Sequence, residues 1–380
     1  MKLRDHFHIV IIGLCVAGFG VARGGLSPTS AMCRGGSGIT AGRLKLGPSE
    51  DHSAFEAGRA LAAVRYLCEE VGPRPSGGEA ERRTAGWIAG RLRGWGYEVT
   101  VQKGVRLGRS GLTTCNVIGR LVRVPAAPRV VNRAHMDCCR GAGYRGANDN
   151  ASGVGVLLEL ARVQARKKLP CTLEVVFFGG EEQFRRYGCK FGSRHYVASG
   201  LARGTRPVVG MISVDMVGRG ERLCAWRRGK QETYLEALVS RSATRLGLSV
   251  RTRRGRANSD HEAFARAGVP SLWLQRLPDP SYHTTKDLPG NLSLRSLSET
   301  GKLLCHVLEG LEAEDVRLLM RERVAHGTVA HHRALESPPT RLVNSCHAAP
   351  ALSRHLVLAC SGRGSAGAAR GRVRRLRREG

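Results

Sequence analysis

The sequence predicts an α/β fold with a mostly parallel central sheet and helices on both faces. Segments with the apolar spacing of helices alternate along the chain with segments typical of strands. Several of these strands are continuous apolar runs, as expected for strands that helices cover on both faces. The chain has 380 residues, of which 42% are hydrophobic, so it is long enough to form a sizeable core.

The predicted elements follow one another in a regular order. Two amphipathic helices come first, in residues 53–72 and 79–96, and the helix-breaking segment PRPSGG separates them. From there, strands and helices alternate as far as residue 314. The predicted strands are 97–105, 115–122, 129–137, 172–180, 208–218, 248–255 and 269–275, and the later helices are 149–162, 192–200, 231–247, 260–268 and 293–314.

Both ends of the chain differ from its middle. Lys2 and Arg4 precede an apolar run, so residues 1–22 predict a signal peptide, or an N-terminal anchor if the segment is not cleaved. The protein would then be exported, to the periplasm or the medium, or be anchored in a membrane. Residues 23–48 predict a linker rich in Gly, Ser and Arg. Residues 316–380 contain 13 Arg, no Lys and 3 Glu, and predict a basic tail that is disordered or weakly helical.

The formal net charge of +30 is high enough to suggest nucleic acid or an anionic surface as a partner. The arginines of the main part of the chain are scattered, however, and no nucleic-acid-binding motif accompanies them. We therefore expect a compositional bias and no specific nucleic-acid partner. The basic tail predicts at most weak contact with anionic surfaces, and the sequence leaves the oligomeric state open.

Acidic and imidazole side chains occur where successive predicted sheet segments end or the next helix begins. In open α/β sheets, binding sites form at the carboxyl ends of the strands, so these side chains are expected to meet there. Each of them alone has a structural explanation; Asp149, for example, could cap the helix that follows it. The candidate residues are His135, Asp137, Asp149, Glu181, Glu182, Asp215 and His283.

The candidates together are harder to explain as structural residues. Carboxylates that are packed side by side are unfavourable unless cations neutralise them. Imidazole and carboxylate groups are ligands that zinc takes in proteins. Two metal ions at a short distance could share one carboxylate between them. The sequence therefore predicts a metal site at this edge of the sheet.

Six motifs between residues 135 and 287 resemble those of the M28 zinc metallopeptidases, the group of the bacterial leucyl aminopeptidases. They are HMD, GANDNASGV, FGGEEQ, SVDMVG, SDHEAFARAGVP and YHTTKD, and the resemblance covers roughly residues 53–314. It implies a zinc-dependent exopeptidase fold of the phosphorylase/hydrolase type. The di-zinc peptidase domain would occupy residues 49–315.

The resemblance also implies a role for each candidate residue. Two zinc ions would be bound, one by His135 and Asp215 and the other by Glu182 and His283, with Asp149 between them. Glu181 would be the general base for a metal-bound hydroxide, and Asp137 would orient His135. The implied substrates are peptides with a free N-terminus, from which an aminopeptidase removes the first residue.

Three other interpretations remain open at this stage. A glutaminyl cyclase shares this fold but uses one zinc ion for an acyl transfer within the substrate. A carboxypeptidase or dipeptidase would use a similar pair of ions. A non-catalytic domain on the same scaffold is expected to have lost ligands, and this sequence has kept them. Cys138 and Cys139, next to the HMD motif, and Arg185 and Arg186, after FGGEEQ, depart from the pattern of the group.

Overall fold

The computed structural model describes residues 54–141, 143–182, 184–200, 206–255 and 259–336. The predicted signal segment or anchor, 1–22, and the predicted linker, 23–48, lie outside the described residues, as does the part of the predicted tail from residue 337 onward. In the part of the chain that is described, no helix is both long enough and apolar enough to cross a membrane.

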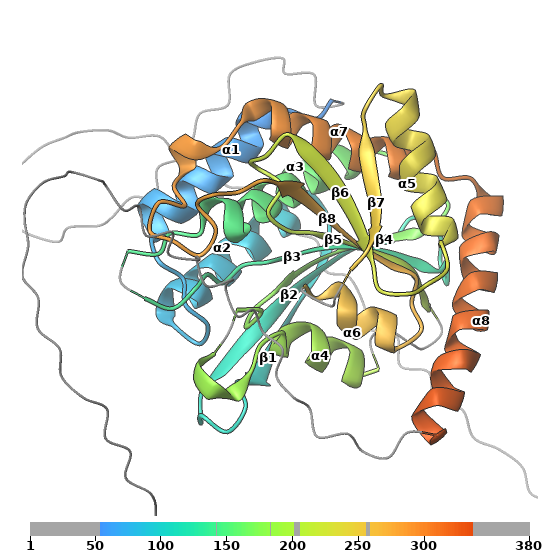
Figure 1. Cartoon of the computed structure of the whole chain (residues 1–380), viewed down its shortest axis with the longest axis horizontal. Coiled ribbons are helices and arrows are strands. Elements are labelled where there is room, and N and C mark those ends of the chain that lie inside the picture. Colours follow the sequence, from blue (N-terminus) through green and yellow to red (C-terminus); the bar gives the residue numbers. More distant parts are fainter. Residues whose placement is uncertain (1–53, 142, 183, 201–205, 256–258, 337–380) are drawn as a thin grey trace, which may run out of the picture. The chain divides into compact units, whose positions relative to one another are not determined.

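An eight-stranded mixed sheet forms the centre of the described unit, in the order β1-β2-β4-β3-β5-β8-β6-β7 (Figure 1). The strands β4, β3, β5 and β8 are parallel neighbours, and β7 is parallel to β6. The remaining pairs are antiparallel. The predicted α/β fold with a mostly parallel central sheet is confirmed. The strands are β1 Glu98–Arg106, β2 Thr113–Leu121, β3 Arg129–His135, β4 Thr172–Phe178, β5 Val208–Val214, β6 Arg222–Arg227, β7 Val250–Arg254 and β8 Ser271–Leu277.

Helices cover both faces of this sheet. Side chains of α1, α2, α3, α5 and α7 belong to one apolar cluster with alternate residues of the strands. The opposite residues of the strands pack with Tyr196 of α4 and Phe264 of α6 in a second cluster. The central strands are buried on both faces, which explains their continuous apolar sequences. The helices are α1 Ala57–Arg65, α2 Glu79–Gly94, α3 Ser152–Gln164, α4 Phe191–Ala198, α5 Tyr234–Arg245, α6 His261–Arg266, α7 Leu294–Glu309 and α8 Ala313–Glu336; short helical segments are η1 Tyr66–Val71, η2 Ala147–Ala151, η3 Arg185–Tyr187 and η4 Pro289–Asn291.

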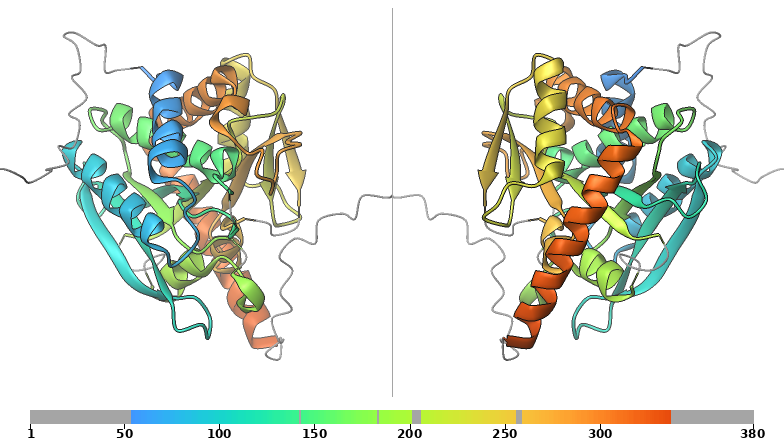
Figure 2. Two further views of the ribbon diagram at one scale, coloured as in Figure 1. Left: turned by 90° about the vertical axis from the view of Figure 1, so that its left-hand side faces the viewer. Right: turned by 90° about the vertical axis from the view of Figure 1, so that its right-hand side faces the viewer.

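Two elements were not expected from the sequence. Strand β6 lies between β8 and β7, in a segment that was not assigned to any element. Helix α8 begins before residue 316 and extends into the predicted tail, passing α5 and β5 (Figure 2). Val316 and Leu319 of this helix are buried in the main apolar cluster. The start of the predicted tail is therefore a packed helix of the same unit.

Candidate metal centre

The candidate residues lie at the carboxyl edge of the parallel strands. His135 is the last residue of β3, and Asp215 follows directly after β5. Glu181 and Glu182 follow β4, and His283 lies in the loop after β8. The chain leaves β4 through Gly179, where a Cβ atom would lie 2.1 Å from the Thr114 hydroxyl oxygen. Only glycine allows so close an approach, and it places the two glutamates at this edge.

Asp149 lies between two groups of ligand atoms. Its Oδ1 is 3.2 Å from Nε2 of His135, and its Oδ2 is 3.2 Å from Nε2 of His283. Asp215 Oδ1 is 3.4 Å from the same nitrogen of His135. Glu182 Oε2 is 3.4 Å from Nε2 of His283. We call His135, Asp149 and Asp215 the inner triad, and Asp149, Glu182 and His283 the outer triad.

The Asp149 carboxylate does not cap helix α3, although its position in the sequence allowed that role. Asn150 Oδ1 instead accepts a hydrogen bond from the N–H of Gly153 in the first turn of α3, at 3.0 Å. The Asp287 carboxylate accepts the N–H groups of Asn148 and Asp149, at 2.7 and 3.0 Å. Both Asp149 oxygens are thus left to face the two histidines.

The loop before Asp149 is also tied to the end of β3. The Arg74 guanidinium, which is buried, donates to the carbonyl oxygens of Met136, Arg145 and Gly146. Arg74 belongs to the segment that separates the first two predicted helices. The sequence suggested that Arg74 was one of many scattered charges. In the structure it connects two segments of the site.

Asp137 links the inner and outer triads. Its carboxylate accepts the N–H groups of Glu181 and Glu182, each at 3.2 Å, and the hydroxyl of Ser76 at 2.6 Å. Nδ1 of His135 is 3.2 Å from the Asp137 carbonyl oxygen and 3.5 Å from its Oδ1. Asp137 therefore fixes both the imidazole ring and the turn that carries the two glutamates.

Behind Asp215 lies a buried polar network that the sequence did not reveal. Ser259 donates its hydroxyl to Asp215 Oδ2 at 2.5 Å and is itself hydrogen-bonded by Arg133. Arg133 also forms an ion pair with Asp260, at 2.9 Å, and lies 3.6 Å from Asp215. Ser259 and Asp260 belong to the SDHEAF motif, but Arg133 carried no signal because a single arginine in a strand resembles any surface charge.

The electrostatics of the cluster are those of several acids close together. Burial raises the pKa of Glu181 well above its usual value, and the neighbouring carboxylates add to the shift. Burial likewise raises the pKa of Glu182. Burial would lower the pKa of His135, but the carboxylates of Asp215, Asp137 and Asp149 outweigh it and raise that pKa well above normal.

This donor set fits metal ions. Two imidazoles and three carboxylates converge here, and Glu182 Oε1 is buried without a hydrogen-bond partner among the described residues. Burying such charges together is costly without a cation. Nitrogen and oxygen donors of this kind suit zinc. The five predicted metal ligands, His135, Asp149, Glu182, Asp215 and His283, are therefore brought together by the fold.

A cavity of about 270 Å³ opens beside the two triads. Glu181, the predicted general base, is part of its wall. Besides polar residues, among them Gln275 and Asp279, the wall has an apolar part that comes from β6, from β8 and from the segments after β5 and β8. The residues of this apolar part include Met216, Trp226, Trp273, Leu277 and Tyr282.

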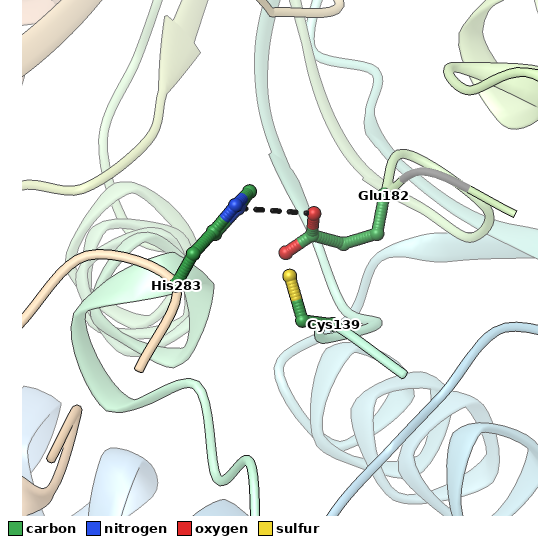
Figure 3. A group of neighbouring side chains, drawn as sticks. All are labelled: Cys139, Glu182 and His283. Atoms are coloured by element: carbon green, nitrogen blue, oxygen red, sulfur yellow. Dashed lines mark ion pairs between the residues drawn. The ribbon is translucent and has the colours of Figure 1, made fainter. Parts of the chain in front are cut away.

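The two cysteines after the HMD motif have different surroundings. Cys138 is buried, and its sulfur accepts the backbone N–H of Arg74 at 3.1 Å. Cys139 lies next to Glu182 and His283 of the outer triad (Figure 3). The sequence placed both thiols near a histidine but did not distinguish them.

A sheet that brings imidazoles and carboxylates together at its carboxyl edge defines a metal-dependent enzyme of the zinc exopeptidase class. The chain belongs to peptidase family M28, a zinc-dependent family, because the model of that family matches residues 116–308, half of the chain.

Individual relatives fall into two groups. Aminopeptidase YwaD of Bacillus subtilis is 31% identical over 171 residues, which are 42% of this chain and 36% of that protein. Glutaminyl-peptide cyclotransferase of Drosophila melanogaster is 30% identical over 213 residues, or 46% of this chain and 59% of that protein. The chain thus spans only about a third to three fifths of the length of these relatives.

Solved structures of both groups share the fold. A zinc aminopeptidase from Bacillus subtilis superposes with a TM-score of 0.60 at 19% identity, covering 69% of this chain and 98% of that one. Glutaminyl cyclase of Tannerella forsythia superposes with a TM-score of 0.59 at 24% identity, covering 68% of this chain and all of the other. At these identities the likeness establishes the fold and leaves the reaction to the site.

Proposed function

We propose that the chain is a di-zinc aminopeptidase that hydrolyses the first peptide bond of peptides with a free N-terminus. The observation that carries the proposal is the bridging position of Asp149, with one oxygen toward His135 and the other toward His283. Both triads are complete, so there are protein ligands for two ions. A single-ion site would need only one of them.

The ligands would divide between the two ions as the triads do. His135 and Asp215 would hold one zinc, Glu182 and His283 the other, and Asp149 both. Zinc in such a site would polarise the scissile carbonyl and make a bound water easier to deprotonate. The remaining steps are the work of the chain's own side chains.

Glu181 is placed to move the proton. Its carboxyl group lies on the wall of the cavity, and its raised pKa suits a group that accepts a proton and then gives it away. It would take the proton from the attacking water and return it to the leaving amine. Asp137 would hold the Glu181–Glu182 turn through the two backbone N–H groups that its carboxylate accepts, and would orient His135 through the contacts of its own oxygens with Nδ1.

The cavity wall suits an apolar first residue. Trp226, Trp273, Met216 and Leu277 present aromatic and aliphatic surface to the 270 Å³ space. Burying a leucine-sized side chain against such surface is worth about 1.5–3 kcal/mol. We therefore expect peptides with a large apolar N-terminal residue to be better substrates than those that begin with glycine or an acid.

A glutaminyl cyclase is the second candidate, because cyclotransferases are among the relatives at about 30% identity. That reaction releases ammonia from an N-terminal glutamine and cleaves no peptide bond. The two candidates therefore differ in product, and the proposed number of zinc ions also differs.

One set of experiments separates them. The purified, zinc-loaded full chain is assayed with aminoacyl-nitroanilides of several side chains and, in parallel, with glutaminyl peptides for ammonia release. Elemental analysis gives the zinc content per chain. Nitroaniline release with two zinc ions per chain supports the aminopeptidase. Ammonia release with one zinc ion, and no nitroaniline, would replace it with the cyclase.

We also propose that the enzyme is exported or membrane-anchored, since residues 1–22 have the layout of a signal peptide or anchor. N-terminal sequencing of the protein after expression in its own host tests this. A mature chain that begins after the apolar run supports cleavage, and recovery of the intact chain in the membrane fraction supports an anchor. An intact chain in the cytosol would contradict both.

A further inference from the structure

Cys139 places a sulfur donor at the outer triad. One donor atom each from Cys139, Glu182 and His283 lie within 4.8 Å of one another, and the imidazole and carboxylate atoms are 3.4 Å apart. Figure 3 shows the three side chains converging, with the second carboxylate oxygen of Glu182 on the side of the sulfur. That oxygen, Oε1, is buried and has no hydrogen-bond partner among the described residues.

A separate small cavity lies at the same place. Its volume is about 10 Å³, and Cys139, Asp149, Glu182 and His283 are among the residues that line it. A space of this size holds about one water-sized particle. It shares Asp149, Glu182 and His283 with the 270 Å³ cavity, but Cys139 lines the small cavity and not the large one, so a particle inside the small cavity would lie beside the sulfur as well as the outer triad.

The neighbouring cysteine shows that this placement is specific. Cys138 is buried and engaged by the backbone N–H of Arg74, and it does not belong to the group of donor atoms. Cys139 is only partly buried, and its sulfur lies toward the outer triad. Two adjacent thiols therefore differ in what they contact.

We infer that Cys139 is a thiolate ligand of the metal ion that Glu182 and His283 hold, an inference that rests on the proposed metal centre. On binding, the S–H bond would break and its proton would pass to solvent. With Asp149 the outer ion would have four protein donors, the complete set of a closed zinc site. The inner ion would have three, His135, Asp149 and Asp215, the number that leaves a position open for reaction.

The sulfur donor of Cys139 also affects which metal ion the outer triad would bind. Thiolate ligands favour zinc and other soft ions over magnesium, calcium and manganese. The outer ion is therefore expected to be the more tightly held and the more selective of the two. Loss of a residue that only hydrogen-bonds to a metal ligand typically lowers metal affinity about 10–100-fold. Loss of Cys139, a direct ligand, is therefore expected to lower the affinity for the outer ion by more than about 100-fold.

Cobalt substitution of the full chain tests the inference. Co²⁺ is added to metal-free protein, and the sulfur-to-cobalt charge-transfer band in the near ultraviolet is recorded. The native chain and Cys138→Ser are expected to show the band, and Cys139→Ser is expected to lack it while still binding cobalt at the inner triad. The serine hydroxyl at position 138 can still accept the Arg74 N–H, so this variant is a matched control.

Two results would overturn the inference. One is a native chain that binds two cobalt ions and shows no thiolate band, and the other is a band that survives in Cys139→Ser. If Cys139→Ser does not fold, alkylation of the native chain replaces it, with the modified cysteines identified by mass spectrometry. Zinc must then protect Cys139 from the reagent, and equal alkylation with and without zinc counts against the inference.

The same experiment separates this inference from the proposed function. A native chain that binds no metal fails the proposed function and the inference together. Two bound ions and nitroaniline release without a thiolate band leave the aminopeptidase intact and remove only the role of Cys139. A thiolate band without nitroaniline release supports the role of Cys139 and contradicts the proposed aminopeptidase.

Discussion

The inner and outer triads share Asp149 but differ in how the fold supports them. The side chain of His135 is 1% exposed, whereas that of His283 is 32% exposed. The inner triad rests on β3, β5 and a buried ion pair, and the outer triad on two loops. The fold therefore holds the imidazole of the inner triad rigidly in the core and leaves the imidazole of the outer triad adjustable near the surface.

Asp149→Ala should have the largest effect, because it removes the one ligand that both triads use. We expect both zinc ions to be lost and hydrolysis to fall below detection. Elemental analysis after gel filtration measures the metal content, and circular dichroism checks the fold. Asp149→Asn, which keeps the size of the side chain, is the companion variant. Two tightly bound zinc ions in Asp149→Ala would mean that the triads are independent sites.

Glu181→Gln and Glu182→Gln should separate proton transfer from metal binding. Glutamine at 181 cannot accept and return a proton, so kcat is expected to fall about 10²–10⁴-fold with zinc content unchanged. Glutamine at 182 should weaken the outer ion and recover part of its activity in excess zinc. Steady-state kinetics at several zinc concentrations measures both. If the two variants exchanged behaviours, the base and the ligand would have been assigned the wrong way round.

Asp260→Ala should show how strongly the inner triad depends on its buried network. It leaves the Arg133 guanidinium buried without its 2.9 Å partner, and such a change costs about 3–5 kcal/mol of unfolding free energy. Urea denaturation measures this loss. Glu314→Ala breaks the exposed ion pair with Arg317 and should cost less than about 1 kcal/mol. Equal effects of the two variants would show that the network is structurally unimportant.

Much of the fold and site could be predicted because the signals were local. The parallel strands are apolar runs, and the candidate ligands lie at the ends of these strands, in the loops that follow them or before the next helix, so their meeting follows from sheet topology. Even Asp149 could be placed, although its cap-like position was ambiguous. The structure resolves the ambiguity through Asn150, whose side chain does the capping.

The rest depended on contacts between distant segments. Strand β6 reads RLCAWR, an apolar run of only four residues between two arginines, and its pairing with β8 and β7 is what identifies it as a strand. Helix α8 looked like the start of a basic tail, because the buried apolar side chains described for it, Val316 and Leu319, are too few to give a pattern. Arg133 is buried only because Asp260 reaches it from 127 positions further along the chain.

Tyr282→Leu should have the smallest effect and should lower the zinc affinity of the outer triad alone. The Tyr282 ring stacks on His283, with centroids 3.8 Å apart and planes inclined by 23°. A stacking contact of this kind is worth about 0.5–1.5 kcal/mol, and its loss should weaken the outer ion by about 2–10-fold. Chelator competition measures the two stepwise zinc affinities. Tyr66→Leu removes a comparable stack on Trp87, at 4.5 Å, and should leave both affinities unchanged. If Tyr282→Leu weakened both ions equally, the two triads would respond as one unit, and the contrast between a rigid and an adjustable side would be wrong.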